Sequence, residues 1–213
     1  MKIKSLEFNF FGVNTYIVWD ELTLEAAIVD PGMFNQKECE SLVSFITDNN
    51  LKVTALINTH MHIDHVAGDD FVEEYYHVGL TAHPSDAFLG LQRDMQVMMF
   101  HLRKINTSPL EINHPVSQGD KIFLGQQYLS VIEVPGHSPG SIALYCPEND
   151  FVITGDALFD GSIGRTDLPG GNYATLIKSI TDRLLTLPPH TNVYPGHGPA
   201  TTIAEEISSN PFF

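Results

Sequence analysis

The segment of residues 57–68, INTHMHIDHVAG, concentrates side chains that can bind metal ions. It places three of the ten histidines of the chain and one aspartate at His60, His62, Asp64 and His65. Side chains two positions apart on an extended segment point to the same side. We therefore expect His60, His62 and Asp64 to converge, with His65 at the start of a turn. Imidazole nitrogens and carboxylate oxygens bind zinc and other first-row divalent metals, so this segment predicts part of a metal site.

Three further candidate ligands follow strand-like runs later in the chain. They are His137 in PGHS, Asp156 in TGDA and His197 in YPGHG. Each is a weak signal alone, because histidine or aspartate beside glycine or proline is common in turns. Added to the first segment they give seven ligands, about the number that two metal ions need if solvent fills the other positions. We predict a site for two divalent metal ions, with zinc favoured and iron or manganese as alternatives.

The periodicity of apolar residues predicts sheets with helices between their strands. Helical periodicity covers residues 36–48, 71–76, 85–104, 172–187 and 203–208. Strands are predicted at IKSLEFNF, NTYIVW, AAIVD, VTALINT, KIFLG, YLSVIEVPG, SIALYC and FVITGD. This order favours an α/β (α+β) fold in one domain over residues 1–213, with helices on the outer faces of the sheets. The candidate ligands lie in loops after strands, where a rigid sheet can position a site.

The order of these motifs resembles that of a known family. THMHIDHVAG, PGHSPGS, GDALF and PGHG follow one another as in the metallo-β-lactamase-fold hydrolases, and the resemblance covers essentially the whole chain. It implies a four-layer αβ/βα sandwich with the metal ions at one edge between two sheets. It also implies three ligand groups, which are His60, His62 and His137 on one metal, Asp64, His65 and His197 on the second, and Asp156 between them.

Hydrolysis at such a site needs no serine or cysteine nucleophile. Metal coordination lowers the pKa of water from about 15.7 towards 7 and so provides hydroxide at neutral pH. Residues 136–140, GHSPG, match the Gly-x-Ser-x-Gly elbow of serine hydrolases, in which the N–H after the serine stabilises the oxyanion. Here that residue is Pro139, which has no N–H, and SIALYC predicts a strand instead of a helix. We interpret Ser138 as a turn residue beside a ligand.

The segment GDALFDGSIGRTDLPGG indicates a substrate class within the family. It resembles the glyoxalase II branch and, through GRTD, the persulfide dioxygenase branch. A bridging aspartate such as Asp156 is not used by the metallo-β-lactamases proper. Arg165 stands where glyoxalase II offers a basic residue to glutathione, whereas its tyrosine position is Asp167 here. Glyoxalase II also has a C-terminal helical domain that completes its glutathione site, and we expect a short, single-domain, glyoxalase II-like protein without it.

The resemblance therefore favours a metal-dependent hydrolase of S-lactoylglutathione or a related hydroxyacyl thioester. Asp64 and Asp156 would position the metal-activated hydroxide, and Arg165 or Tyr194 would help the thiolate to leave. For Arg165, a salt bridge inside the GSIGRTD turn is an equal alternative. Other functions compatible with the motifs are a persulfide dioxygenase with a single iron ion, a lactonase, and a metal-binding module without activity. The complete ligand set argues against the last of these.

Composition and charge limit the partners and the location. The net charge of −15, from 11 basic and 26 acidic residues, argues against a nucleic-acid partner. No apolar run approaches the roughly 18 residues of a membrane helix, and the N-terminus alternates apolar with polar residues instead of resembling a signal peptide. We expect a cytoplasmic protein that binds a small-molecule thioester, with no membrane association and no obligate protein partner evident. Cys39 and Cys146 predict buried apolar positions and not a disulfide framework.

Residues 86–104, DAFLGLQRDMQVMMFHLRK, form a methionine-rich segment. Met95, Met98 and Met99 lie close together beside leucine and phenylalanine. Methionine fills irregular gaps in protein cores, so we interpret the segment as a core-facing helix. The alternative interpretation is a flexible apolar lid over a cleft.

Overall fold

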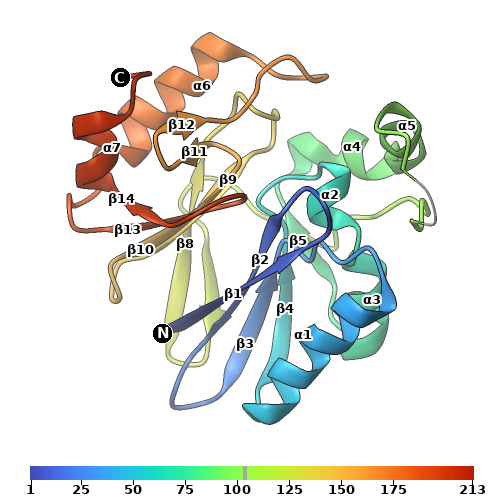
Figure 1. The fold of residues 1–213 in the computed structure, drawn as a ribbon. Coiled ribbons are helices and arrows are strands. Elements are labelled where there is room, and N and C mark those ends of the chain that lie inside the picture. Colours follow the sequence, from blue (N-terminus) through green and yellow to red (C-terminus); the bar gives the residue numbers. More distant parts are fainter. Residues whose placement is uncertain (103–104) are drawn as a thin grey trace.

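The computed structural model, which describes residues 1–102 and 105–213, is a four-layer αβ/βα sandwich (Figure 1). Two six-stranded sheets lie against each other, and each carries helices on its outer face. The N-terminal half of the chain forms one sheet with its helices, and the C-terminal half forms the other. The predicted α/β class and the sandwich implied by the family resemblance are confirmed.

The first sheet has the order β1-β2-β3-β4-β5-β6. Its first three strands are antiparallel and the rest add in parallel. Helices α1 (Gln36–Asp48), α2 (Ile63–Val66) and α3 (Asp69–Tyr76) connect its strands. The strands are β1 (Lys2–Phe8), β2 (Val13–Trp19), β3 (Glu25–Val29), β4 (Lys52–Ile57), β5 (Leu80–Ala82) and β6 (His114–Pro115).

The second sheet has the order β14-β13-β10-β9-β8-β7. It is antiparallel apart from the β10–β13 pair. Helix α6 (Tyr173–Ser179), a π-helical turn at Ile180–Leu184 and helix α7 (Ile203–Ser209) cover it. The strands are β7 (Lys121–Leu124), β8 (Gln127–Glu133), β9 (Ile142–Cys146), β10 (Phe151–Gly155), β13 (Asn192–Pro195) and β14 (Thr201–Thr202), and a separate hairpin pairs β11 (Leu158–Phe159) with β12 (Ser162–Ile163).

The central strands are buried on both faces because each sheet lies between a helical layer and the other sheet. Val29 of the first sheet and Leu144 of the second belong to the cluster between the sheets. Leu42 and Ile46, four positions apart on α1, pack onto the outer face of the first sheet. Helix α1 begins at Asn35, whose side chain accepts hydrogen bonds from the first-turn amides. The strands that sequence analysis did not predict, such as β5, β6 and β13, are short.

The predicted helix over residues 85–104 is wrong as a single element. A 3₁₀ turn at Pro84–Asp86 is followed by α4 (Ala87–Leu91) and α5 (Arg93–Met99), while residues 103 and 104 lie outside the described part. The break follows Gly90, whose carbonyl accepts a hydrogen bond from the Leu110 amide instead of continuing the helix. The core-facing interpretation is wrong for the methionines, because Met95, Met98 and Met99 are each more than half exposed, although Val97 of the same helix packs against the core.

Two other expectations concern the whole chain. Cys39 and Cys146 are buried and free, as predicted. Within residues 1–102 and 105–213, no helix has the length and apolar character needed to cross a membrane.

The layer between the sheets predicts a strong dependence of stability on Leu144. We expect Leu144→Ala to lower the free energy of unfolding by about 2–5 kcal/mol, because it leaves a cavity in a fully buried cluster. Leu22→Ala is the control, since this leucine is 80% exposed and should change stability by less than about 0.5 kcal/mol. Urea denaturation followed by circular dichroism measures both. Equal effects of the two substitutions would contradict the described core.

Candidate metal centre

The seven candidate ligands meet at one edge of the sandwich, in segments that follow four strands. His60 and His62 lie in the loop after β4, and Asp64 and His65 lie on α2 directly behind it. The other three come from the second half of the chain, where each lies just beyond a strand end: His137 after β8, Asp156 after β10 and His197 after β13.

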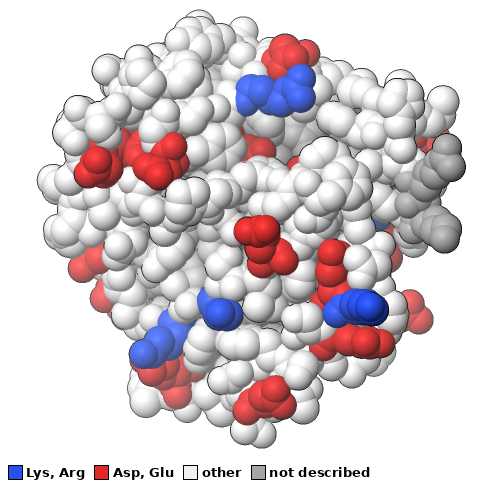
Figure 2. Space-filling model, viewed as in Figure 1, with Lys and Arg blue, Asp and Glu red and all other residues white. Residues whose placement is uncertain are grey.

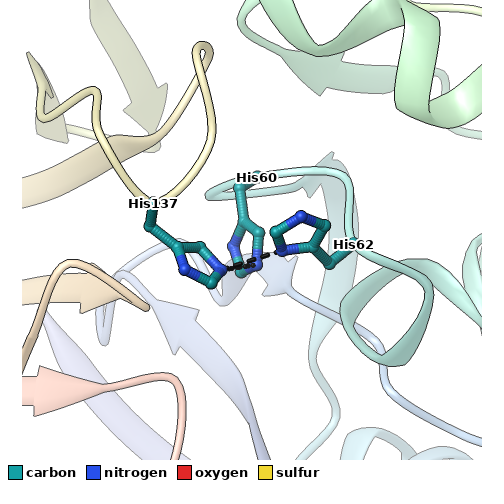
Figure 3. Close-up of side chains that lie close together, drawn as sticks. All are labelled: His60, His62 and His137. Carbon is teal, nitrogen blue, oxygen red and sulfur yellow. Dashed lines mark hydrogen bonds between the residues drawn. The ribbon is translucent and has the colours of Figure 1, made fainter. Parts of the chain in front are cut away.

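The first group consists of three histidines whose rings point toward one another (Figure 3). His62 Nδ1 lies 2.8 Å from His137 Nε2, and His60 Nε2 lies 3.2 Å from the same atom. The rings are close to perpendicular to each other, with interplanar angles of 80–88°. All three side chains are buried. Three ring nitrogens therefore converge on one point from two distant segments of the chain.

The second group consists of Asp64, His65 and His197. His65 Nε2 lies 3.2 Å from His197 Nε2, and Asp64 Oδ2 lies 3.4 Å from the same His197 atom. Asp156 stands between the two groups. Its Oδ1 is 3.3 Å from His65 Nε2, and its Oδ2 is 3.5 Å from His197 Nε2 and 3.6 Å from His137 Nε2. One carboxylate thus reaches both groups of histidines.

The outer ring nitrogens of three histidines face groups that only accept hydrogen bonds. His137 Nδ1 lies 2.8 Å from the Arg165 carbonyl, and His197 Nδ1 lies 3.0 Å from the Phe11 carbonyl. His65 Nδ1 lies 3.1 Å from Asp30 Oδ2. Each Nδ1 must therefore carry the hydrogen, which leaves Nε2 of a neutral ring as a lone pair directed into the centre.

These lone pairs and carboxylates fit a cation between them. Nitrogens 3.2 Å apart, as in His65 and His197, repel unless a proton or a metal ion lies between them. Asp156 Oδ1 and His62 Nε2 are buried without a hydrogen-bond partner among the described residues. Buried polar atoms are rarely left unpaired without a functional reason. The donor set of imidazoles and carboxylates is the one that zinc, iron and manganese accept.

The pKa values of the site differ between its two sides. Burial lowers the pKa of His62 to about 3 and holds that of His60 well below its usual value. Burial would also lower the pKa of His65, but the carboxylates of Asp156 and Asp64 raise it well above its usual value. Burial would raise the pKa of Asp156, yet His65 and the imidazoles around it hold it well below the usual range. The site therefore keeps its carboxylates ionised and His60 and His62 neutral, whereas His65 favours a proton that a bound metal ion would displace.

The local conformation explains why neighbouring residues belong to different groups. His62 is extended, with φ −72° and ψ 148°, and the helix α2 begins at the next residue. Asp64 and His65 therefore project from a helical turn and not from a strand. The expectation that His60, His62 and Asp64 share one side is wrong for Asp64, since extended geometry ends at His62.

Close packing around Asp156 depends on two glycines. A Cβ at Gly196 would clash with Asp156 Oδ1, and a Cβ at Gly164 would clash with the Asp156 carbonyl. Gly196 is the residue before His197, so the loop can bring its histidine to the carboxylate only because position 196 has no side chain.

Two buried aspartates that sequence analysis missed hold the ligand loops in place. Asp30 accepts hydrogen bonds from the Thr59 amide and hydroxyl, at 2.7 and 2.6 Å, besides facing His65. Asp86 accepts from the Met61 amide at 3.1 Å and from Ser138 Oγ at 2.6 Å, and so joins the loop after β4 to the loop after β8. The position of Asp30 at the end of the AAIVD strand could have indicated its place beside the ligands. No sequence motif indicated that Asp86 joins the two ligand loops.

The other residues considered from the sequence have mixed outcomes. Arg165 forms a two-pronged ion pair with Asp167, with both contacts at 2.7 Å, and holds the pKa of Asp167 at about 2. Ser138 is buried, and its hydroxyl donates to Asp86, as suits a turn residue. The structure does not bring Tyr194 to the site. Strand β13 turns its ring into the layer between the sheets, beside Tyr16 at a centroid distance of 5.8 Å.

A cavity of about 190 Å³ opens over the site, and we call it the metal cavity. Five of the candidate ligands face it, and Phe11, Phe100, Leu168 and Arg165 form its walls. Figure 2 shows this face hollowed near its top, with acidic atoms inside the hollow and a basic and an acidic group together on the rim. A small molecule can therefore reach the convergent histidines from solvent.

Comparison with known families agrees with this geometry. The family model described as Metallo-beta-lactamase superfamily matches residues 8–197. The chain belongs to this superfamily. Membership of the superfamily supports the interpretation that the protein is a metallo-hydrolase. It also accounts for the clustered histidines and aspartates.

Individual members of the superfamily are similar over nearly their full length. The probable metallo-hydrolase YqgX of Bacillus subtilis is 37% identical and the match covers 88% of this chain and 87% of that protein. Hydroxyacylglutathione hydrolase GloC of Haemophilus influenzae is 35% identical, with 100% and 98% covered. Among solved structures, BLEG-1 B3 metallo-beta-lactamase has a TM-score of 0.89 at 32% identity, covering 99% of both chains. TTHA1623 in a di-iron-bound form has a TM-score of 0.87 at 35% identity, covering 99% and 100%.

The contacts of Asp30 predict an effect on metal affinity without contact to substrate. We expect Asp30→Asn to weaken metal binding about 10–100-fold, because His65 loses the carboxylate that orients its ring. Competition with a chromophoric chelator measures the affinity. Asp150→Asn, at an exposed surface position, is the control and should leave it unchanged. Unchanged metal affinity in a folded Asp30→Asn protein would show that this carboxylate does not orient the ligand.

Proposed function

We propose that this protein is a dinuclear metal hydrolase that cleaves a thioester such as S-lactoylglutathione or a related hydroxyacyl thioester. The position of Asp156 carries the proposal. Its two oxygens lie within 3.3–3.6 Å of Nε2 atoms from both groups of histidines, which suits a carboxylate shared by two ions. The similarity to hydroxyacylglutathione hydrolase GloC supports the substrate class.

Two divalent ions bound by the seven residues would supply Lewis acidity and a water molecule of lowered pKa. The residues that would hold them form three groups: His60, His62 and His137, then Asp64, His65 and His197, and Asp156 in common. Asp64 and Asp156 both face the metal cavity, where an ionised carboxylate can orient the attacking water by accepting its hydrogen.

Water is the expected nucleophile, because the two thiols of the protein lie away from the metal cavity. Phe11, Phe100 and Leu168 limit access of bulk water to the reacting carbonyl from the sides. Cys39 and Cys146 are buried in hydrophobic clusters, and their pKa values are raised by burial. Neither thiol can act at the site.

Arg165 stands on the rim of the metal cavity with its side chain 55% exposed. Its guanidinium can attract a carboxylate of the thiol carrier while Asp167 holds it in place. The salt bridge and the substrate contact, which are alternatives from the sequence, are therefore compatible.

Three alternative functions are compatible with the site. The similarity to a structure in a di-iron-bound form supports iron as a metal that this site can hold. A persulfide dioxygenase would instead bind a single iron ion through His60, His62 or its neighbour, and Asp156. The similarity to BLEG-1 B3 metallo-beta-lactamase favours β-lactam hydrolysis, which also attacks a carbonyl. A lactone is a further carbonyl substrate for the same residues.

Metal content and turnover measured on one preparation test the proposal. We expect two metal ions per chain and hydrolysis of S-lactoylglutathione without oxygen consumption. Chelation should abolish turnover, and His137→Ala and Asp64→Ala should each lower kcat/KM by about 10³-fold or more, because metal catalysis supplies several kcal/mol.

His190→Ala, at an exposed site paired with Asp150, is the control and should keep full activity. Turnover that survives in a metal-depleted Asp64→Ala protein would overturn the proposal. One iron per chain with oxygen uptake would replace it by the dioxygenase, and faster cleavage of a cephalosporin or a lactone would replace the substrate class.

The rim position of Arg165 gives a separate expectation. We expect Arg165→Ala to raise KM for S-lactoylglutathione about tenfold. The reason is the loss of one charge-assisted contact to the substrate, which contributes about 1.4 kcal/mol. It should change the free energy of unfolding by less than about 1 kcal/mol, because the pair with Asp167 is exposed. Steady-state kinetics and urea denaturation measure the two effects. Lys178→Ala, in an exposed pair on α6, serves as the control, and an unchanged KM for Arg165→Ala would leave only the structural salt bridge.

A further inference from the structure

Helix α5 (Arg93–Met99) buries two polar side chains and exposes three apolar ones, which is unusual for a surface helix. Arg93 is fully buried and Gln96 is 7% exposed, whereas Met95, Met98 and Met99 are 58%, 74% and 51% exposed. Amphipathic helices normally turn their apolar stripe to the core. Contiguous exposed apolar side chains indicate a binding surface more often than chance.

The buried polar residues fix this helix to the loop that carries the metal ligands. Gln96 Oε1 accepts a hydrogen bond from the Ile63 amide at 2.9 Å, and Gln96 Nε2 donates to the Leu89 carbonyl at 3.0 Å. Arg93 donates to Asp70 Oδ2 at 2.7 Å and to the Ser108 carbonyl at 2.9 Å. This orientation is therefore held by specific contacts, and it aims the methionine side of α5 outward beside the metal cavity.

A second, narrow cavity of about 50 Å³ lies between α4, α5 and the loop before α6, and we call it the methionine cleft. Most of its lining is apolar, and its floor and walls include Phe88, Leu89, Met95, Met99, Phe100 and Leu168. It adjoins the metal cavity, since His62, Phe100 and Leu168 line both. In Figure 2 the surface over α4, at the upper right, carries few charged side chains.

We propose that the methionine cleft binds an apolar substituent of the substrate, a short alkyl chain, while the thioester carbonyl lies in the metal cavity. This proposal rests on the proposed function and adds a specificity subsite to it. His62 marks the junction, because one ring both belongs to the first histidine group and lines the cleft. A chain attached to the reacting carbonyl or to its sulfur can therefore extend directly into the apolar lining.

The size and composition of the cleft limit the ligand. A water-sized group takes about 10–15 Å³ of such a volume, so the cleft has room for only a few carbon atoms. Methionine side chains are unbranched and flexible, so Met95 and Met99 can close around chains of slightly different shape. We expect affinity to rise over the first few methylene groups and then to level off.

Two series of thioesters test the cleft on the metal-loaded protein. One varies the acyl group from acetyl to butanoyl and hexanoyl on N-acetylcysteamine, and the other varies an alkanethiol with a constant acetyl group. In one of the series, kcat/KM should rise about fifteenfold over the first two added methylenes, at about fourfold for each buried methylene. The series that responds identifies which side of the thioester occupies the cleft. Cleavage of both series without a rise in either overturns the proposal.

Matched substitutions on α5 assign the effect to the cleft. Met95→Gln with Met99→Gln should lower the butanoyl-to-acetyl ratio, or its thiol counterpart, by at least about threefold, because polar groups then line the apolar wall. Met98→Gln is the control, since Met98 is the most exposed of the three methionines and does not line the cleft. An unchanged ratio in the double variant, or an equal loss in Met98→Gln, overturns the proposal.

Binding without turnover separates this proposal from the proposed function. Calorimetry with acetate, butanoate and hexanoate on the metal-loaded protein should show affinity that rises with chain length and that depends on Met95 and Met99. If no thioester is cleaved but this dependence is present, the proposed function fails and the cleft stands. If thioesters are cleaved but neither binding nor turnover depends on chain length, the cleft fails alone.

Discussion

Nitrogen lone pairs and carboxylates repel one another at the edge of the sandwich, where the fold brings seven such side chains together. His65 and His197 approach within 3.2 Å, and their outer nitrogens face Asp30 and a backbone carbonyl. Such atoms stay together only if a cation offsets the repulsion or if the fold holds them there. The buried, ionised Asp156 sits where that cation would be shared. Membership of the metallo-beta-lactamase superfamily is consistent with this arrangement.

The fold holds these groups with contacts that lie outside the ligand set. Asp30 ties Thr59 and His65 to the end of β3, and Asp86 ties the loop after β4 to the loop after β8. Each aspartate accepts several hydrogen bonds while buried, so its charge is compensated locally. Because each histidine group combines ligands from both sheets, packing between the sheets sets the distances within each group.

The same loop also fixes the surface that surrounds the site. Gln96 bonds to the loop after β4 from one side of α5, which leaves Met95 and Met99 on the other side, along a narrow cleft. A charged group and apolar groups therefore occupy different sides of the opening. Arg165 lies on the rim of the metal cavity, and the methionines line the adjoining cleft. This separation suits a substrate that carries a polar reacting group and a small apolar part.

The sequence alone was sufficient for the fold class and for the list of side chains that meet at the centre, because turn residues and ligand types after strand ends are local signals. It indicated His137, Asp156 and His197 as candidates although they lie far from His60 along the chain. Tertiary structure decided what local patterns do not encode. The turn into α2 after His62 separates Asp64 from the first histidine group, and packing turns Tyr194 inward. The methionines of α5 face outward because buried hydrogen bonds of Arg93 and Gln96, formed with segments distant in sequence, outweigh the apolar preference of the helix for the core.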